Sequence, residues 1–246
     1  MIITFWSVDG GVGKTTLSVN TACKLAKKYP LKKVLLLDLN LNNPDTDKHL
    51  GFEPKNLVEL YNDFYANSIT VEKLKNYLIK YHKLSNLFIF SGLYNIEYVC
   101  KFQPEHFELL IEYYKNMDFD YIVIDINSVL NYDASYVAVD KSDVLLVVGE
   151  PTMASLRNLQ RYLNTISQIK DKKDIFIVIN KYKNDILSKD LISKTFPDYK
   201  IFFIERMDIM EKYINNQIPV VLLEKKNRQE NAFDTSLDFL LKLITN

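Results

Sequence analysis

Long apolar runs that do not alternate with polar residues are the main feature of this chain's hydrophobic pattern. They predict strands near residues 2–7, 34–37, 87–90, 121–125, 144–149, 175–179 and 200–204. Strands without polar alternation are typical of a sheet that helices cover on both faces. Most of the segments between them show helical spacing and are long enough for right-handed crossovers. The pattern therefore predicts an α/β fold with a mostly parallel, twisted sheet and helices on both faces.

Length and composition favour one domain over residues 1–246. Hydrophobic residues make up 48% of the chain and charged residues 25%, which is typical of a globular protein and excludes a disordered one. No internal repeat, low-complexity segment or Pro/Gly-rich linker marks a domain boundary. The segment 56–83 is rich in Tyr, Leu and Lys, and we expect mostly helices and their connection there.

A glycine-rich loop follows the first predicted strand directly, where residues 9–16 have the sequence DGGVGKTT. Its glycines let the backbone turn tightly and bring successive N–H groups onto phosphate oxygens, and the helix predicted after it adds its positive end. Lys14 would reach the terminal phosphates, and the Thr15 hydroxyl would help to hold Mg²⁺. The strict phosphate-loop pattern has a glycine where this chain has Val8. Because a strand and a helix flank the loop as that motif requires, we predict a nucleotide-binding site.

The loop resembles the deviant phosphate loop of the MinD/ParA family of ATPases, and the resemblance extends over nearly the whole chain. Residues 34–40, VLLLDLN, are similar to that family's second strand and first switch, and residues 120–125, DYIVID, are similar to its Walker B strand. The resemblance implies a P-loop fold, ATP and Mg²⁺ as cofactors, and a nucleotide-linked homodimer. It also implies metal-site roles for Thr15, Asp38 and Asp125, and catalytic roles for Lys14, Asp38 and Asn40.

Further segments resemble the pilus-assembly branch of the family, called CpaE or TadZ. They are residues 142–148, 150–151, 155–158 and 179–182. In the family, an asparagine at the position of Asn180 recognises the adenine ring, which implies ATP rather than GTP. The guanine-reading pattern Asn-Lys-x-Asp is incomplete, because Lys183 holds its last position. The predicted cofactor-binding residues are Asp9, Gly10, Gly11, Val12, Gly13, Lys14, Thr15, Thr16 and Asn180.

Two residues depart from the family pattern. Asp9 stands where the family carries a signature lysine that contacts phosphates across the dimer interface, and a carboxylate near a triphosphate repels it. Asn40 stands where the first switch usually has a second carboxylate, and an amide holds a water molecule but does not take its proton. We therefore expect weak or partner-dependent hydrolysis. The alternative is an active ATPase in which Arg157 or Lys181 supplies the replacement cation.

The resemblance favours a protein that forms a dimer and positions a larger assembly, with pilus or secretion machinery as the preferred assembly. Two other functions stay open. One is a fully active ATPase of the MinD or ParA kind, which serves cell division, flagellar placement or DNA partition. The other is a non-catalytic dimeric scaffold. The rate of ATP turnover, and whether the dimer forms only with nucleotide, separate these alternatives.

The charge balance bears on the choice of partners. Lys and Arg together equal Asp and Glu at 31 each, so the net charge is zero and nucleic acid is a disfavoured partner. Several lysines cluster at the end of the first predicted helix, where the helix dipole and solvation explain them. This cluster consists of Lys24, Lys27, Lys28, Lys32 and Lys33.

We expect a cytoplasmic protein that reaches the inner membrane or a cell pole only through a partner. The loop follows so early that no signal peptide is expected, and no apolar run approaches the roughly 18 residues that cross a bilayer. The two cysteines are far apart and predict no disulfide. Near the C-terminus, apolar residues recur at helical spacing, but the other face is not rich in Lys and Arg. We therefore expect this helix to pack on the sheet rather than on a membrane. Its apolar positions are Phe233, Leu237, Leu240, Leu241 and Ile244.

Overall fold

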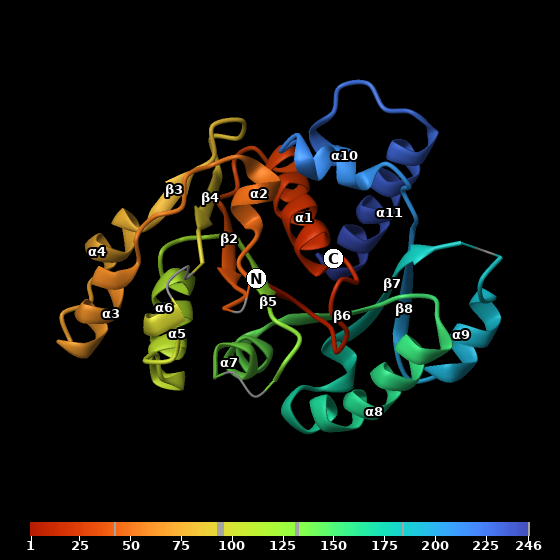
Figure 1. Ribbon diagram of the computed structural model, residues 1–246, viewed down its shortest axis with the longest axis horizontal. Coiled ribbons are helices and arrows are strands. Elements are labelled where there is room, and N and C mark those ends of the chain that lie inside the picture. The colour runs from red at the N-terminus through yellow and green to blue at the C-terminus, as the bar shows by residue number, and fades with distance from the viewer. Residues whose placement is uncertain (42, 93–95, 131–132, 184, 246) are drawn as a thin grey trace.

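One eight-stranded sheet organises the computed structural model, which describes residues 1–41, 43–92, 96–130, 133–183 and 185–245 (Figure 1). Its strands are β1 (Ile2–Trp6), β2 (Val34–Leu39), β3 (Leu78–Lys80), β4 (Leu87–Phe90), β5 (Tyr121–Ile126), β6 (Val144–Gly149), β7 (Ile175–Tyr182) and β8 (Lys200–Glu205). Their order across the sheet is β3-β4-β2-β5-β1-β6-β7-β8. Neighbouring strands pair in parallel, except that β3 and β4 are antiparallel.

The sheet confirms the predicted fold class, and each of the seven predicted strands is present. The segment 56–83 contains β3 as well as helices, and the sequence pattern did not reveal this strand. β3 has three residues, which are half-buried or exposed, and it pairs only with β4 at the edge of the sheet. Three residues are too few to form an apolar run or an alternating pattern from which a strand could be predicted.

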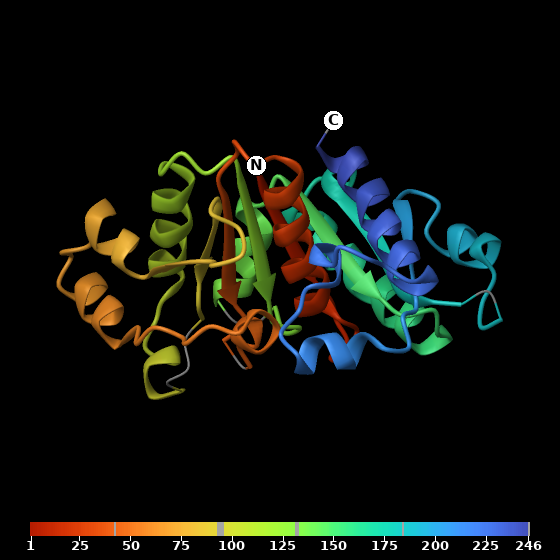
Figure 2. The same cartoon turned by 90° about the horizontal axis from the view of Figure 1, so that it is seen from above.

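Helices cover both faces of the sheet, as Figure 2 shows from above. On one face lie α1 (Lys14–Lys28) and α11 (Arg228–Ile244). On the other lie α6 (Pro104–Lys115), α7 (Asp133–Lys141) and α8 (Met153–Ile169). The remaining helices are α2 (Thr46–Leu50), α3 (Val58–Tyr65), α4 (Val71–Asn76), α5 (Ile96–Val99), α9 (Lys189–Thr195) and α10 (Met210–Asn215), with two 3₁₀ turns, η1 (Lys172–Asp174) and η2 (Val220–Leu222).

Strand residues alternate between two hydrophobic cores, one on each face of the sheet. In β1, Ile2 and Trp6 join the core beneath α6, α7 and α8, whereas Ile3 and Phe5 join the core beneath α1 and α11. None of these four side chains is more than 1% exposed. Because successive side chains point to opposite faces of a strand, burial on both faces favours apolar residues at consecutive positions, and the buried hydroxyl of Thr4 donates to the carbonyl of Ala138 at 3.1 Å. This arrangement explains the uninterrupted apolar runs.

The C-terminal helix α11 packs on the sheet, as its spacing predicts. Its apolar stripe, which includes Phe233, Leu237 and Leu240, is buried in the core that it shares with α1. Within the described ranges, no helix is long and apolar enough to cross a membrane.

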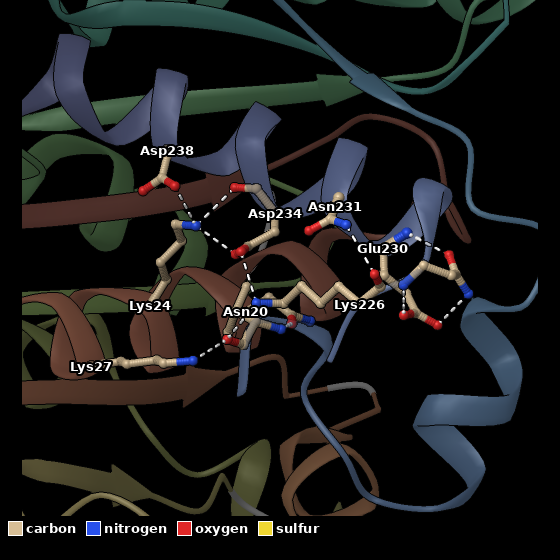
Figure 3. A network of polar contacts seen from close by, with 10 residues as sticks. Asn20, Lys24, Lys27, Lys226, Glu230, Asn231, Asp234 and Asp238 are labelled. Carbon is tan, nitrogen blue, oxygen red and sulfur yellow. Dashed lines mark hydrogen bonds and ion pairs between the residues drawn. The ribbon is translucent and has the colours of Figure 1, made fainter. Parts of the chain in front are cut away.

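Ion pairs join α11 to α1 beside this core. Figure 3 shows Lys24 of α1 pointing toward Asp234 and Asp238 of α11, and its Nζ lies 2.8 Å from Asp238 Oδ2. The Nζ of Lys27 donates to the carbonyl of Val221 at 3.0 Å. The side chain of Lys24 is only 8% exposed, so its ion pairs are screened little by solvent. A third member of the lysine cluster, Lys32, pairs with Asp120 at 2.7 Å, so three of the five lysines are engaged within the chain.

The carboxyl ends of the central strands β2, β5 and β1 lie next to one another at the same end of the sheet. These strands are adjacent and parallel, so their ends meet as they do at the ligand crevices of open α/β sheets. β1 leads into the glycine-rich loop, and the register of β2 with β5 places Asp38 directly beside Asp125. Residues from three separate parts of the sequence therefore converge.

Candidate functional site

The glycine-rich loop takes a conformation that only glycine accommodates without strain at two positions. Gly11 has φ 71° and Gly13 has φ 93°, both in the left-handed region. A Cβ on Gly13 would lie 2.5 Å from Asn180 Nδ2. α1 begins immediately afterwards at Lys14 and has no acidic residue in its first turn. The N–H groups of this turn therefore offer a site for an anion.

Lys14 lies between two serine hydroxyls. Its Nζ donates to Ser7 Oγ at 2.9 Å and to Ser128 Oγ at 2.8 Å, and the residue is 8% exposed. Both hydroxyls in turn donate to the carbonyl of Asp9, at 2.6 Å and 3.1 Å. Burial lowers the pKa of Lys14, and the nearby carboxylates of Asp125 and Asp9 oppose this effect. The ammonium group is thus held close to the loop.

Sequence reasoning did not single out Ser7 or Ser128. The only available signal was position, because each serine follows the end of a strand at the edge where the site forms. Ser7 follows β1 and Ser128 lies two residues after β5.

Thr15 and Asp125 meet beneath the loop. Thr15 Oγ1 donates to Asp125 Oδ2 at 2.6 Å. The other carboxylate oxygen, Asp125 Oδ1, is buried and has no hydrogen-bond partner among the described residues. Burial raises the pKa of Asp125, and burial together with the charge of Asp125 raises the pKa of Asp38 beside it. Two adjacent buried carboxylates of this kind are stabilised in their charged form by a cation.

This donor set fits Mg²⁺ bound together with a nucleotide. In the described part of the chain, no three His, Cys, Asp or Glu side chains form a cluster that would hold a metal ion alone. Mg²⁺ commonly takes one or two protein oxygens and completes its shell with phosphate oxygens and waters. The Thr15 hydroxyl and the unpartnered oxygen of Asp125 would supply such ligands, and bound Mg²⁺ would neutralise charge on the phosphates.

Asp38 is held by its own switch segment. Its Oδ1 accepts from the backbone N–H of Asn40 at 3.0 Å, and its Oδ2 accepts from Thr46 Oγ1 at 2.8 Å. The backbone N–H of Thr46 also lies 3.3 Å from Oδ2. Thr46 is the first residue of α2, so the carboxylate caps that helix. Sequence reasoning missed Thr46, whose contact with Asp38 exists only in the folded chain.

A cavity of about 430 Å³ is lined by the loop, by the first switch segment after β2 and by the segment after β5, here called the second switch segment. Asn40 of the first and Ser128 and Val129 of the second line it. The predicted position of Asn40 beside the phosphates is therefore compatible with the fold, and its catalytic role stays a prediction. The lining residues are Gly10, Gly11, Gly13, Lys14, Thr15, Thr16, Asn40, Asn43, Asp45, Asn127, Ser128 and Val129.

The carboxylate of Asp9 binds to α8, a placement that differs from the expected one beside the phosphates. Ser155 Oγ donates to Asp9 Oδ2 at 2.7 Å, and Asn158 Nδ2 donates to Asp9 Oδ1 at 2.8 Å. Both donors lie in the first two turns of α8, where the helix dipole favours an anion. These contacts reduce the repulsion that the sequence suggested. Arg157, one of the two suggested replacement cations, is exposed on the same helix.

A second cavity, of about 360 Å³, adjoins the other side of the loop. Asn180, at the end of β7, lines it together with the segment after β8. The amide of Asn180 is engaged by the loop, because Nδ2 donates to the carbonyl of Val12 at 2.7 Å. Its predicted contact with adenine stays a prediction. The lining residues are Gly11, Gly13, Thr16, Glu150, Asn180, Lys181, Glu205, Arg206, Met207, Asp208, Met210, Glu211, Ile214 and Phe233.

Known proteins resemble this chain in sequence and in structure. A family model described as an AAA domain, AAA_31, matches residues 1–179. The septum site-determining protein MinD of Synechocystis sp. is 29% identical over 187 residues, which make up 76% of this chain and 66% of that protein. The MinD of Buchnera aphidicola subsp. Schizaphis graminum is 26% identical over 254 residues, covering 98% of this chain and 90% of that protein.

Solved structures share the fold. MinD from Pyrococcus horikoshii, complexed with Mg-ADP, has a TM-score of 0.81 and 22% identity, with 98% of this chain and 96% of that chain covered. The match to the Synechocystis protein spans just under two thirds of that relative. The chain belongs to the AAA_31 family of AAA domains, and it is similar in sequence to MinD proteins.

Proposed function

We propose that this protein binds Mg-ATP at the glycine-rich loop, forms a nucleotide-linked homodimer and positions a larger assembly. The observation that carries the proposal is the convergence of three groups on the loop. The Lys14 ammonium, the Thr15 hydroxyl and the unpartnered Asp125 oxygen lie at the start of α1, where backbone N–H groups also favour an anion. The relative from Pyrococcus horikoshii was solved with Mg-ADP, which supports the choice of ligand.

Each predicted residue has a defined task in this proposal. The backbone of residues 10–13 and the Lys14 side chain bind phosphate oxygens, and Thr15 and Asp125 hold Mg²⁺. Asp38 lies beside Asp125 and supports the metal site. Asn180 faces the base from the wall of the 360 Å³ cavity. The absence of a complete guanine-reading motif supports adenine as the base.

Hydrolysis in this proposal is weak or depends on a partner. Asn40 lines the 430 Å³ cavity and stands where the first switch of the family has a carboxylate, and its amide orients water but takes no proton. The Asp9 side chain, bound to α8, supplies no cation across a dimer interface. Both features slow phosphoryl transfer, which depends on positioning and charge stabilisation.

Pilus or secretion machinery is the preferred assembly, and the resemblance of residues 142–148, 150–151, 155–158 and 179–182 to CpaE and TadZ supports it. Division-site placement is the second candidate, and it is favoured by MinD relatives such as the Buchnera protein that aligns with 98% of this chain. In either role the protein acts in the cytoplasm and reaches a membrane or cell pole through its partner.

Phosphate release from Mg-ATP, measured over a range of protein concentrations, tests this function. Lys14→Ala serves as the background, because it removes the ammonium group from the loop. The proposal predicts slow release that rises more than linearly with concentration, since two chains are needed. Fast release that is strictly linear with concentration would instead indicate a monomeric, fully active ATPase.

A further inference from the structure

β7 ends in an irregular way next to the loop. The pairing of β7 with β8 shifts register between Ile179 and Tyr182. Within this bulge, Lys181 adopts φ 54°, a left-handed conformation that is unfavourable for a residue with a long side chain. Bulges near functional sites re-aim side chains, and strained residues persist only where their surroundings hold them.

The bulge directs two consecutive side chains onto two consecutive peptide groups of the loop. Asn180 Nδ2 donates to the carbonyl of Val12 at 2.7 Å, and Lys181 Nζ donates to the carbonyl of Gly11 at 2.8 Å. Lys181 Nζ also forms an ion pair with Glu150 Oε1 at 2.6 Å. Glu150 follows β6 directly, so the ammonium group is anchored from a second strand.

These contacts fix the direction of the N–H groups in the loop. A trans peptide is planar, and its C=O and N–H bonds point in opposite directions. A carbonyl of Gly11 that is held toward Lys181 therefore turns the N–H of Val12 away from β7. In the same way, the contact of Asn180 with Val12 turns the N–H of Gly13 away. Two successive N–H groups that share one direction form an anion-binding nest.

We propose that Lys181, oriented by Glu150, is a positioning residue that clamps the phosphate loop from β7. The inference rests on the proposed function and deepens it, because it names a residue outside the loop motif that prepares the loop for polyphosphate. Lys181 acts through the backbone of residues 11–13, with its ammonium group held by the Gly11 carbonyl and by Glu150.

The first test uses Mg-tripolyphosphate and Mg-ATP as probes, because tripolyphosphate has no base to contact the 360 Å³ cavity. Lys181→Met should lower the affinity for both ligands by a similar factor, about tenfold, whereas Lys181→Arg should retain most of the affinity. Lys183→Met is the matched control, since Lys183 pairs with Asp208 and its side chain is 41% exposed against 43% for Lys181. Unchanged tripolyphosphate binding by Lys181→Met, or an equal loss in Lys183→Met, would overturn the clamp.

Glu150→Ala separates positioning from charge. A role through charge alone predicts tighter tripolyphosphate binding, because the variant removes a negative group. The clamp predicts weaker binding, because Lys181 loses its anchor. Tighter binding would contradict the proposal.

Hydrogen exchange at the amides of residues 11–13, measured without nucleotide, tests the clamp independently of binding. Lys181→Met should exchange faster there, with an unchanged melting temperature, and Lys183→Met should match the wild type. Equal exchange in Lys181→Met and the wild type would refute the clamp. If the wild type binds neither ligand, the proposed function fails, and the exchange result still decides on the clamp.

Discussion

Asp9 illustrates how a single residue is accommodated against its family pattern. The carboxylate would repel a bound polyphosphate, yet it is turned onto α8, where Ser155 and Asn158 each donate a hydrogen bond. Hydrogen bonds to a charged group contribute more than neutral ones, and an anion near the start of a helix is favoured by its dipole. At position 9, a residue that would act across an interface is replaced by one that binds within its own chain.

Replacement of Asp9 by alanine should lower the free energy of unfolding by about 1–2 kcal/mol, because Ser155 and Asn158 lose their acceptor. Urea unfolding of Asp9→Ala and the wild type measures this difference. Asp171→Ala is the control, since the Asp171 side chain is 75% exposed. Equal midpoints for Asp9→Ala and the wild type would contradict the assigned contacts.

Asn40→Asp should raise ATP turnover about tenfold or more, because a carboxylate accepts a proton from water and an amide does not. Steady-state phosphate release provides the measurement. Asn43→Asp is a suitable control, since Asn43 lines the same cavity. If both variants release phosphate at the wild-type rate, the slow step lies elsewhere, for instance in the missing cation at position 9.

The sequence predicted the residues of the site that belong to a motif, and missed those that only the fold brings there. Lys14 and Thr15 follow β1 through the loop and Asp125 lies near the carboxyl end of β5, so their convergence follows from parallel pairing. Ser128 and Thr46 are common small residues that belong to no motif with a fixed spacing. Their contacts depend on the exact path of the chain after β5 and β2, which hydrophobic periodicity does not encode.

At the scale of elements, the short helix α2 links the metal side of the site to the rest of the fold. Asp38 caps its first residue, Thr46. The helix packs on α1 and α10. His49, near its end, is 9% exposed, and burial lowers its pKa to about 4, although Asp45 and Asp47 oppose the shift. The imidazole is therefore neutral in the folded protein at pH 7.

This burial predicts an acid-sensitive stability. The pKa of His49 is about 4 in the folded protein and 6.5 in the unfolded chain. Between these two pH values the unfolded chain binds more protons than the folded protein. The free energy of unfolding therefore falls as the pH drops from about 6.5 to 4. By pH 5 the loss from His49 should reach about 2 kcal/mol. Urea unfolding at pH 7 and pH 5 measures it, and His49→Gln should lose correspondingly less. An identical pH dependence in the variant would contradict the assignment.

Most of the sheet was predictable, because burial on both faces leaves an uninterrupted apolar run in each central strand. β3 was not, since its three residues lie at an edge and its pairing with β4 is a tertiary event. The bulge in β7 could not be predicted from the sequence either. Asn180 and Lys181 continue an apolar strand, and the residue with the left-handed conformation is a lysine and not a glycine.

At the scale of the whole molecule, one edge of the sheet carries the loop, both switch segments and the two cavities. A nucleotide bound there would lie at the surface of a single domain, where a second copy can reach it. With Mg-ATP, light scattering should therefore report a mass near twice the 28.8 kDa of the chain, and Mg-ADP should leave it near 28.8 kDa. A dimer of equal extent without nucleotide would favour the scaffold function.

Calorimetric titration of Mg-ATP into the wild type and Lys14→Ala tests nucleotide binding at the loop, with circular dichroism to confirm that both proteins are folded. We expect saturable binding to the wild type that requires Mg²⁺, and an affinity at least about tenfold lower in Lys14→Ala, because the variant removes the buried ammonium group that would contact phosphate. Equal affinity in the two proteins would contradict this expectation.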